Sequence, residues 1–141
     1  MNQSIKEHYE RICNHLFLFD PAIRFAGITT LGGDIIAVQY GKGVMPLLSP
    51  DELQLSMKQA LMKFAIRRTM EDKLGKAIYA ITVYQKVKRA TITIHDGQGK
   101  EDDMLLMISL EKEADHEAII TEKIIPFLAT IGKMPATDHQ T

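Results

Sequence analysis

The sequence predicts a single α+β domain built on an antiparallel sheet, and three observations support this fold class. First, 141 residues with 45% hydrophobic content are enough for one core of ordinary size. Second, the predicted elements follow the order helix, two strands, long helix, three strands, helix, with short links between strands. Third, two of the later strands are apolar on both faces, so helices are expected to cover both sides of the sheet.

Charge and composition bear on several function classes. A formal net charge of −1 leaves no overall excess of cations, so we expect no nucleic-acid partner despite the local cluster Lys86, Lys88 and Arg89. Cys13 is the only cysteine, which excludes an internal disulfide and is typical of the reducing cytoplasm. The N-terminus is polar and no run approaches about 18 apolar residues, so neither a signal peptide nor a membrane span is expected.

The first helix is predicted to begin at a capping box formed by Ser4 and Glu7 and to end before Asp20-Pro21. Its apolar side consists of residues at helical spacing: Ile5, Tyr9, Ile12 and Leu16. His8 and His15 lie seven residues apart on one flank. Zinc binding would need a further ligand from elsewhere, and solvated histidines are the alternative interpretation.

A β-hairpin is predicted from Ile23 to Val38, around the turn Leu31-Gly32-Gly33-Asp34. The next segment, Tyr40-Gly41-Lys42-Gly43, is rich in glycine but does not match a phosphate-binding P-loop, because no Gly-Lys-Ser/Thr follows at a helix start. We interpret it as a turning connector, with a backbone anion nest as the alternative.

The long helix is predicted over residues 49–74. Ser49-Pro50-Asp51-Glu52 supplies an N-cap, a proline at the first helical position and a capping box, and Gly75 supplies a left-handed stop. The C-terminal end of this helix is basic, with Arg67, Arg68 and Lys73. These cations complement the helix dipole, and contact with an acidic partner is the alternative explanation.

Two apolar stripes run along opposite sides of this helix. The first comprises Leu53, Met57, Ala60, Leu61 and Phe64, and the second comprises Leu55, Met62, Ile66 and Met70. A domain of this size normally buries only one such stripe, so the second predicts a partner. The alternative is a helix buried on both sides within one domain.

Three strand-forming runs follow, at residues 77–84, 87–95 and 104–110, and they predict an antiparallel meander. The acidic loop at residues 96–103 lacks the spacing of a calcium-binding EF-hand and is interpreted as a solvated hairpin tip. A final helix capped by Asp115 should kink or end early at Pro126. We therefore expect one domain over residues 1–131 and a flexible tail over residues 132–141.

Across roughly residues 4–131 this order of elements resembles the roadblock/LC7 family of profilin-like domains. The resemblance implies a five-stranded antiparallel sheet with the long helix on one face and the N- and C-terminal helices on the other, in the order α-β-β-α-β-β-β-α. The phrases Ile23-Arg24-Phe25-Ala26-Gly27-Ile28 and Lys73-Leu74-Gly75-Lys76 are also similar to an uncharacterised family of small archaeal proteins.

In roadblock-like dimers the long helix packs against its mate, and the strand after it pairs with the equivalent strand. This arrangement would cover the second stripe and the strand at residues 77–84, which has neither proline nor charge and would otherwise expose a pairing edge. The dimer interface is therefore predicted to include Leu55, Gln59, Met62, Ile66, Thr69, Met70, Tyr79, Ile81 and Val83.

The leading functional hypothesis is a cytoplasmic, non-enzymatic homodimer that serves as an adaptor or regulatory domain, with a small GTPase as the partner that the family resemblance implies. The alternative is a small-molecule sensor of profilin-like or PAS-like type, in which the connector at residues 41–44 encloses a ligand beside Tyr9, Phe25 and Tyr40.

Catalysis is not expected, because no residue set matches a catalytic pattern. Cys13 lies on the core-side flank of a helix with only His8 and His15 nearby in sequence. Asp102 and Asp103 lie in a predicted solvated turn, where nothing would separate their pKa values. We expect no catalytic residue, metal ion or cofactor.

Overall fold

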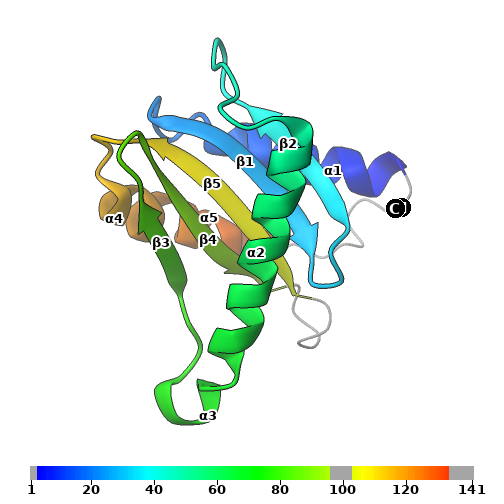
Figure 1. The fold of residues 1–141 in the computed structure, drawn as a ribbon. Helices are drawn as coiled ribbons and strands as arrows, with labels where there is room; N and C mark the ends of the chain where they lie inside the picture. Colours follow the sequence, from blue (N-terminus) through cyan, green and yellow to red (C-terminus); the bar gives the residue numbers. More distant parts are fainter. Residues whose placement is uncertain (1–2, 96–102, 134–141) are drawn as a thin grey trace.

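A computed structural model describes residues 3–95 and 103–133 of the chain. Five strands form one antiparallel sheet, in the spatial order β2-β1-β5-β4-β3 (Figure 1). The strands are β1 (Ile23–Thr30), β2 (Ile35–Tyr40), β3 (Tyr79–Val83), β4 (Val87–Ile94) and β5 (Met104–Glu111). The last three form the predicted meander, so β3 and β2 are the two edge strands.

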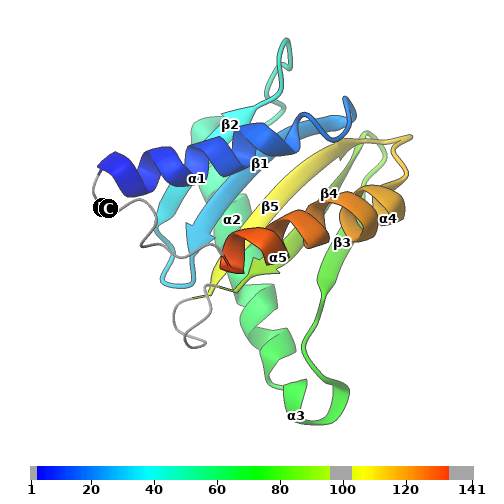
Figure 2. The ribbon, with the colours of Figure 1, turned by 180° about the vertical axis from the view of Figure 1, so that it is seen from behind.

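Helices cover the sheet on opposite faces. Helix α2 (Pro50–Arg68) crosses one face, and α1 (Gln3–Leu16) lies on the other face beside the C-terminal helical segment (Figure 2). That segment consists of α4 (His116–Ala118), a π-helical stretch (Ile119–Ile124) and α5 (Ile125–Lys133). The predicted fold class and the assignment of helices to faces are therefore confirmed.

The central strand β5 supplies side chains to both cores. Leu106, Ile108 and Leu110 are fully buried beneath α1 and the C-terminal segment, whereas Leu105 and Met107 are buried beneath α2. The core on the α1 face contains side chains from all five strands. On the α2 face, the apolar core is built from β1, β2 and β5 and does not extend to β3 and β4.

Two positions in the first hairpin require glycine, one for its backbone conformation and one for close packing. Gly33 takes a φ of 101° in the tight turn between β1 and β2, as the predicted turn requires. Gly27 allows α2 to lie close to β1, because a Cβ at this position would be 2.9 Å from Cζ of Phe25 and 3.3 Å from Cε of Met57.

Helix α2 begins as predicted. The Ser49 side chain accepts a hydrogen bond from the Glu52 N–H at 3.2 Å, and the Ser49 N–H donates to Glu52 Oε1 at 2.9 Å, which completes the capping box.

The predicted end of this helix at residue 74 is wrong, because α2 ends at Arg68. The Thr69 hydroxyl donates to the Ile66 carbonyl at 2.7 Å, and the Thr69 N–H also contacts that carbonyl, so the last turn tightens. A separate single turn, α3 (Glu71–Leu74), follows and ends at Gly75 with a φ of 83°.

The C-terminal segment does not end early at Pro126. A proline ring would clash with the carbonyl four residues earlier, at Glu122. In this protein the helix changes to π-type backbone hydrogen bonding just before the proline, with the Ile125 N–H donating to the Ile120 carbonyl. The helix then continues to Lys133. Residues 132 and 133 are therefore helical, and the rest of the predicted tail lies outside the described residues.

Most of the predicted hairpin tip, residues 96–102, also lies outside the described residues. Asp103 corrects the expectation of a solvated turn, because its side chain is buried and its Oδ1 lies 3.2 Å from Nδ1 of His95. Within the described parts of the chain, no helix combines the length and apolar content needed to cross a bilayer.

Candidate interaction surface

The second predicted apolar stripe is exposed, with Leu55, Met62 and Ile66 on α2 and Met70 just beyond its end. The exposed fractions are 58% for Leu55, 65% for Met62, 67% for Ile66 and 57% for Met70. The sheet-facing residues Leu53, Met57, Ala60 and Phe64 are at most 9% exposed. The alternative of a helix buried on both sides within one domain is therefore wrong, and the stripe forms an outer face of the isolated chain.

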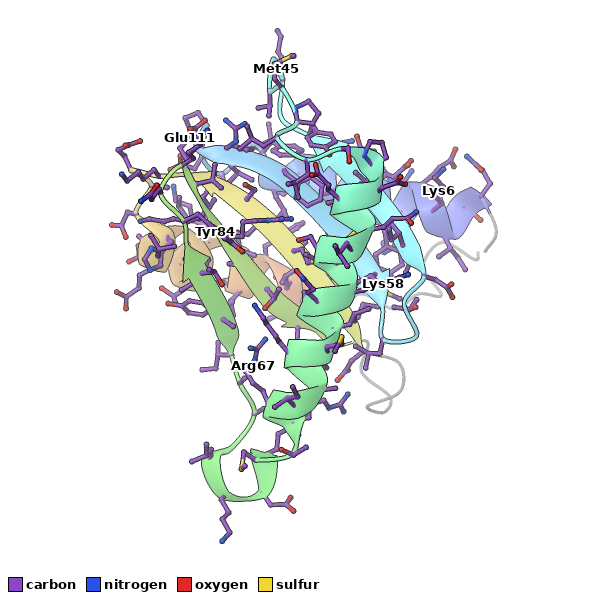
Figure 3. All side chains as sticks on the ribbon, viewed as in Figure 1. Lys6, Met45, Lys58, Arg67, Tyr84 and Glu111 are labelled. Carbon is purple, nitrogen blue, oxygen red and sulfur yellow. The ribbon has the colours of Figure 1, made fainter. Side chains whose placement is uncertain are left out.

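The direction of this outer face follows from helical geometry. At about 100° per residue, the stripe lies roughly opposite the sheet-facing side chains. The two flanks of α2 face the two halves of the sheet, with Arg67 on the side of β3 and Lys58 on the side of β2 (Figure 3). Gln59 and Thr69, which belong to the predicted interface, lie outside the core as well.

The edge strand β3 offers backbone groups rather than large side chains. Tyr84 N–H donates to the Val87 carbonyl at 2.8 Å, so alternation places the free N–H and C=O groups on the odd-numbered residues of β3. These are the predicted interface residues Tyr79, Ile81 and Val83. The side chains of Tyr79 and Ile81 pack partly against the core on the α1 face, and only that of Val83 is mostly exposed.

A shallow groove separates α2 from β3 and β4, where the apolar core on this face ends. Its walls include the cations Lys63, Arg67 and Arg89, and no acidic side chain is among the lining residues. Ala80 and Thr82 line it from β3. The sequence analysis missed these two residues, although the strict alternation of a strand would have placed them on the face opposite Ile81.

Several solved structures share this arrangement of helices and strands. The Roadblock/LC7 domain from Streptomyces avermitilis matches with a TM-score of 0.62 at 16% identity, covering 94% of this chain and 98% of that chain. MglB from Myxococcus xanthus matches with a TM-score of 0.70 at 9% identity, covering 95% and 92%. The chain has a roadblock/LC7-like fold. The predicted resemblance is thereby confirmed.

The gliding protein MglB from Thermus thermophilus also matches, with a TM-score of 0.67 at 11% identity, covering 94% of this chain and 87% of that one. Comparisons with protein-family models and with curated proteins give no match. The similarity to small archaeal proteins stays a prediction.

The histidines of α1 contact aromatic rings in this roadblock-like domain. His15 stacks on Phe127 with ring centroids 4.4 Å apart, and His8 meets Tyr9 edge to face. Across residues 3–95 and 103–133, no group of three or more His, Cys, Asp or Glu side chains is placed to hold a metal ion.

Cys13 is completely buried in the core on the α1 face. Burial, together with the nearby charge of Glu10, raises the pKa of its thiol from 9.0 to about 12. A thiol in this environment stays protonated near neutral pH, so it lacks the thiolate that nucleophilic catalysis requires.

We expect native Cys13 to resist alkylation by iodoacetamide at pH 9, where an ordinary thiol is half ionised. The native protein should react at least about 100-fold more slowly than the urea-unfolded chain. Since the folded pKa is raised, the stability that the neutral thiol contributes is complete below pH 9.0 and is lost progressively above it. Mass spectrometry of the labelled protein measures the rates, and equal rates would show that the thiol is accessible and ionised.

Proposed function

We propose that the protein is a non-enzymatic, homodimeric adaptor or regulatory domain, and that it self-associates through the outer face of α2. The exposure of Leu55, Met62 and Ile66 along one face of α2, with the exposed Met70 just beyond the end of the helix, carries the proposal. Each square ångström of apolar surface removed from water is worth about 25 cal/mol, so a contact along the whole stripe is favoured. A contiguous apolar face of this kind is characteristic of an interaction site.

A second copy of the chain suits this face. The stripe is nearly symmetric about a point between Gln59 and Met62, so two antiparallel copies of α2 would place Leu55 of each chain near Ile66 of the other. The first turn of α2 is acidic and the last turn is basic, and antiparallel packing brings these opposite charges together. An isologous twofold contact of this type is the commonest oligomer symmetry.

The free edge of β3 supports a second area of contact. The five residues of β3 include neither proline nor charge, which are the usual devices that prevent edge pairing. Pairing of β3 with its counterpart would continue the sheet from one copy to the next. Because α2 and β3 are separated by the groove, the two contacts are distinct areas that can be tested separately.

The partner of this assembly is proposed to be a small GTPase. This proposal rests on the resemblance to the roadblock family, whose fold this chain shares. Lys63 and Arg67 offer a basic flank to an acidic partner surface, because both lie beside the groove without an acidic neighbour among its lining residues.

The first prediction concerns the helix contact. Ile66→Asp should raise the dimer dissociation constant by more than about 100-fold, because an aspartate buried without a partner costs several kcal/mol. Ala65→Asp is the matched control, since residue 65 is exposed on the neighbouring flank. Sedimentation velocity over a concentration series measures the association.

The folded state of the monomer should be nearly unaffected by Ile66→Asp, because the side chain is 67% exposed. Its urea midpoint, measured at a concentration where both variants are monomeric, should match that of Ala65→Asp. A wild-type protein that stays monomeric at high micromolar concentration would contradict the proposed homodimer.

A second variant tests the strand contact. Val83→Pro removes an N–H that points to the free edge and keeps the donors that pair β3 with β4. We expect roughly tenfold weaker association without loss of the β-sheet signal in circular dichroism. Unchanged association in this variant, together with a clear effect of Ile66→Asp, would restrict the interface to α2.

A third measurement tests the partner. Purified small GTPases encoded in the same genome as this chain, loaded with either GDP or a non-hydrolysable GTP analogue, should bind the dimer with different affinities in the two states. Calorimetric titration measures both. If none of these GTPases binds, a GTPase is rejected as the partner. The homodimer is then tested only by the association of the Ile66→Asp and Val83→Pro variants.

A further inference from the structure

A cavity of about 290 Å³ lies between the loop at residues 44–48, the first half of α2 and the sheet, where β1, β2, β4 and β5 all contribute lining residues. Figure 3 labels two of its lining residues, Met45 on the projecting loop and Tyr84 after the end of β3. Phe25, Tyr40 and Val44 line it as the sensor hypothesis expects, whereas Tyr9 lies on the other face of the sheet and does not. Most of the lining is apolar: Phe25, Val44, Leu47, Leu48, Leu53 and Leu55.

One charged group in this cavity lacks a counter-ion. Arg89 on β4 donates from Nη1 to Oγ of Ser56 at 2.8 Å, and its guanidinium carbon lies 5.9 Å from the centre of the Phe25 ring. No carboxylate within the described residues forms an ion pair with it. The serine uses one of the five N–H donors of the guanidinium, so most of its hydrogen-bonding capacity is available.

The other charged groups in the lining are already engaged. Arg24 pairs with Glu111 through Nη1 at 3.0 Å and donates from Nη2 to the Met45 carbonyl at 3.2 Å. Glu52 accepts the Ser49 N–H in the capping box. Arg89 is therefore the cation in this cavity that is placed to receive an anionic ligand.

The surroundings of Arg89 favour such a ligand. Burial lowers the pKa of Arg89 below its usual range, and the phenol groups of Tyr84 and Tyr40 act in the opposite direction. An arginine stays charged in a protein, so the desolvation cost is borne by the folded state until an anion pairs with it. The tyrosine hydroxyls can donate further hydrogen bonds to the same anion.

We propose that this cavity binds a small amphiphilic monocarboxylate. The carboxylate would pair with the Arg89 guanidinium in a two-pronged contact, and the apolar body would lie against Phe25, Val44 and Leu53. At about 30 Å³ per water-sized group, the cavity has room for a ligand of roughly ten non-hydrogen atoms. This volume lies near the lower end for small-molecule pockets, about 300–1,000 Å³.

Octanoate, octanol and octylammonium provide a matched set of probes, because they share the alkyl chain and differ in the charge of the head group. Isothermal titration calorimetry of the purified full chain should show octanoate binding at least tenfold more tightly than octanol, with no binding of octylammonium. Equal affinity for octanoate and octanol would overturn the proposal, as would preference for the cation.

Two substitutions identify the anchoring group. Arg89→Gln should abolish the preference for octanoate over octanol, whereas Arg24→Gln, which removes a cavity arginine that is already paired, should retain it. Retention of the preference in Arg89→Gln would overturn the assignment of the anchor. Val44→Trp, which adds bulk to the apolar lining and keeps Arg89, should reduce binding of both probes and gives an independent test if Arg89→Gln does not fold.

Ile66→Asp tests this inference apart from the proposed homodimer, because Ile66 does not line the cavity, although the predicted interface residues Leu55 and Gln59 do. Ile66→Asp should therefore keep the preference for octanoate over octanol. Failure of octanoate binding with intact self-association would reject the ligand alone, and the reverse result would reject the dimer alone.

Discussion

Strand β5 lies at the centre of the sheet, and its alternate side chains enter two separate cores. Because Leu106 and Ile108 face one way and Leu105 and Met107 the other, the strand requires a helical layer on each face. Two helical layers therefore have to pack at the same time, but they are unequal in width. The α1 face is covered by α1 and the C-terminal segment side by side, whereas α2 alone serves the other face.

This inequality accounts for the features that bear on function. One helix is too narrow to cover five strands spaced about 4.8 Å apart, so β3 and β4 are left outside the core beneath α2. The groove, the cavity around Arg89 and the free edge of β3 all lie in or beside this uncovered half of the sheet. The outer face of α2 is exposed for a related reason, since the described chain supplies no third layer on that side.

Sequence patterns predicted this architecture where local signals and packing agree. The capping box at Ser49 and the turn at Gly33 are short-range features, and both formed as predicted. The end of α2 was misplaced because Gly75 was interpreted as its stop, whereas α2 ends at Arg68, where the Thr69 hydroxyl bonds back to Ile66, and Gly75 ends the separate turn α3. A kink or an early end was predicted at Pro126 because its ring clashes with the carbonyl of Glu122 in a regular α-helix, but the π-helical stretch before it accommodates the ring.

The functional surface was predictable only in part. The spacing of Leu55, Met62 and Ile66 revealed the outer stripe, because helical periodicity requires no tertiary information. Arg89 was counted in a basic cluster with Lys88, yet strand alternation sends Lys88 to the Ala114 carbonyl on one face and Arg89 to Ser56 on the other. Which neighbours a strand residue meets depends on the register with distant segments, and a single sequence does not contain that register.

Leu55, on the outer stripe of α2, and Gln59, an exposed residue of the predicted interface, both also line the wall of the cavity. The proposed ligand and the proposed second copy would therefore contact the same side chains. Their binding free energies would then be linked, and linkage is reciprocal: each event would change the affinity of the other by the same factor. These two residues would form a short physical route between ligand binding and self-association.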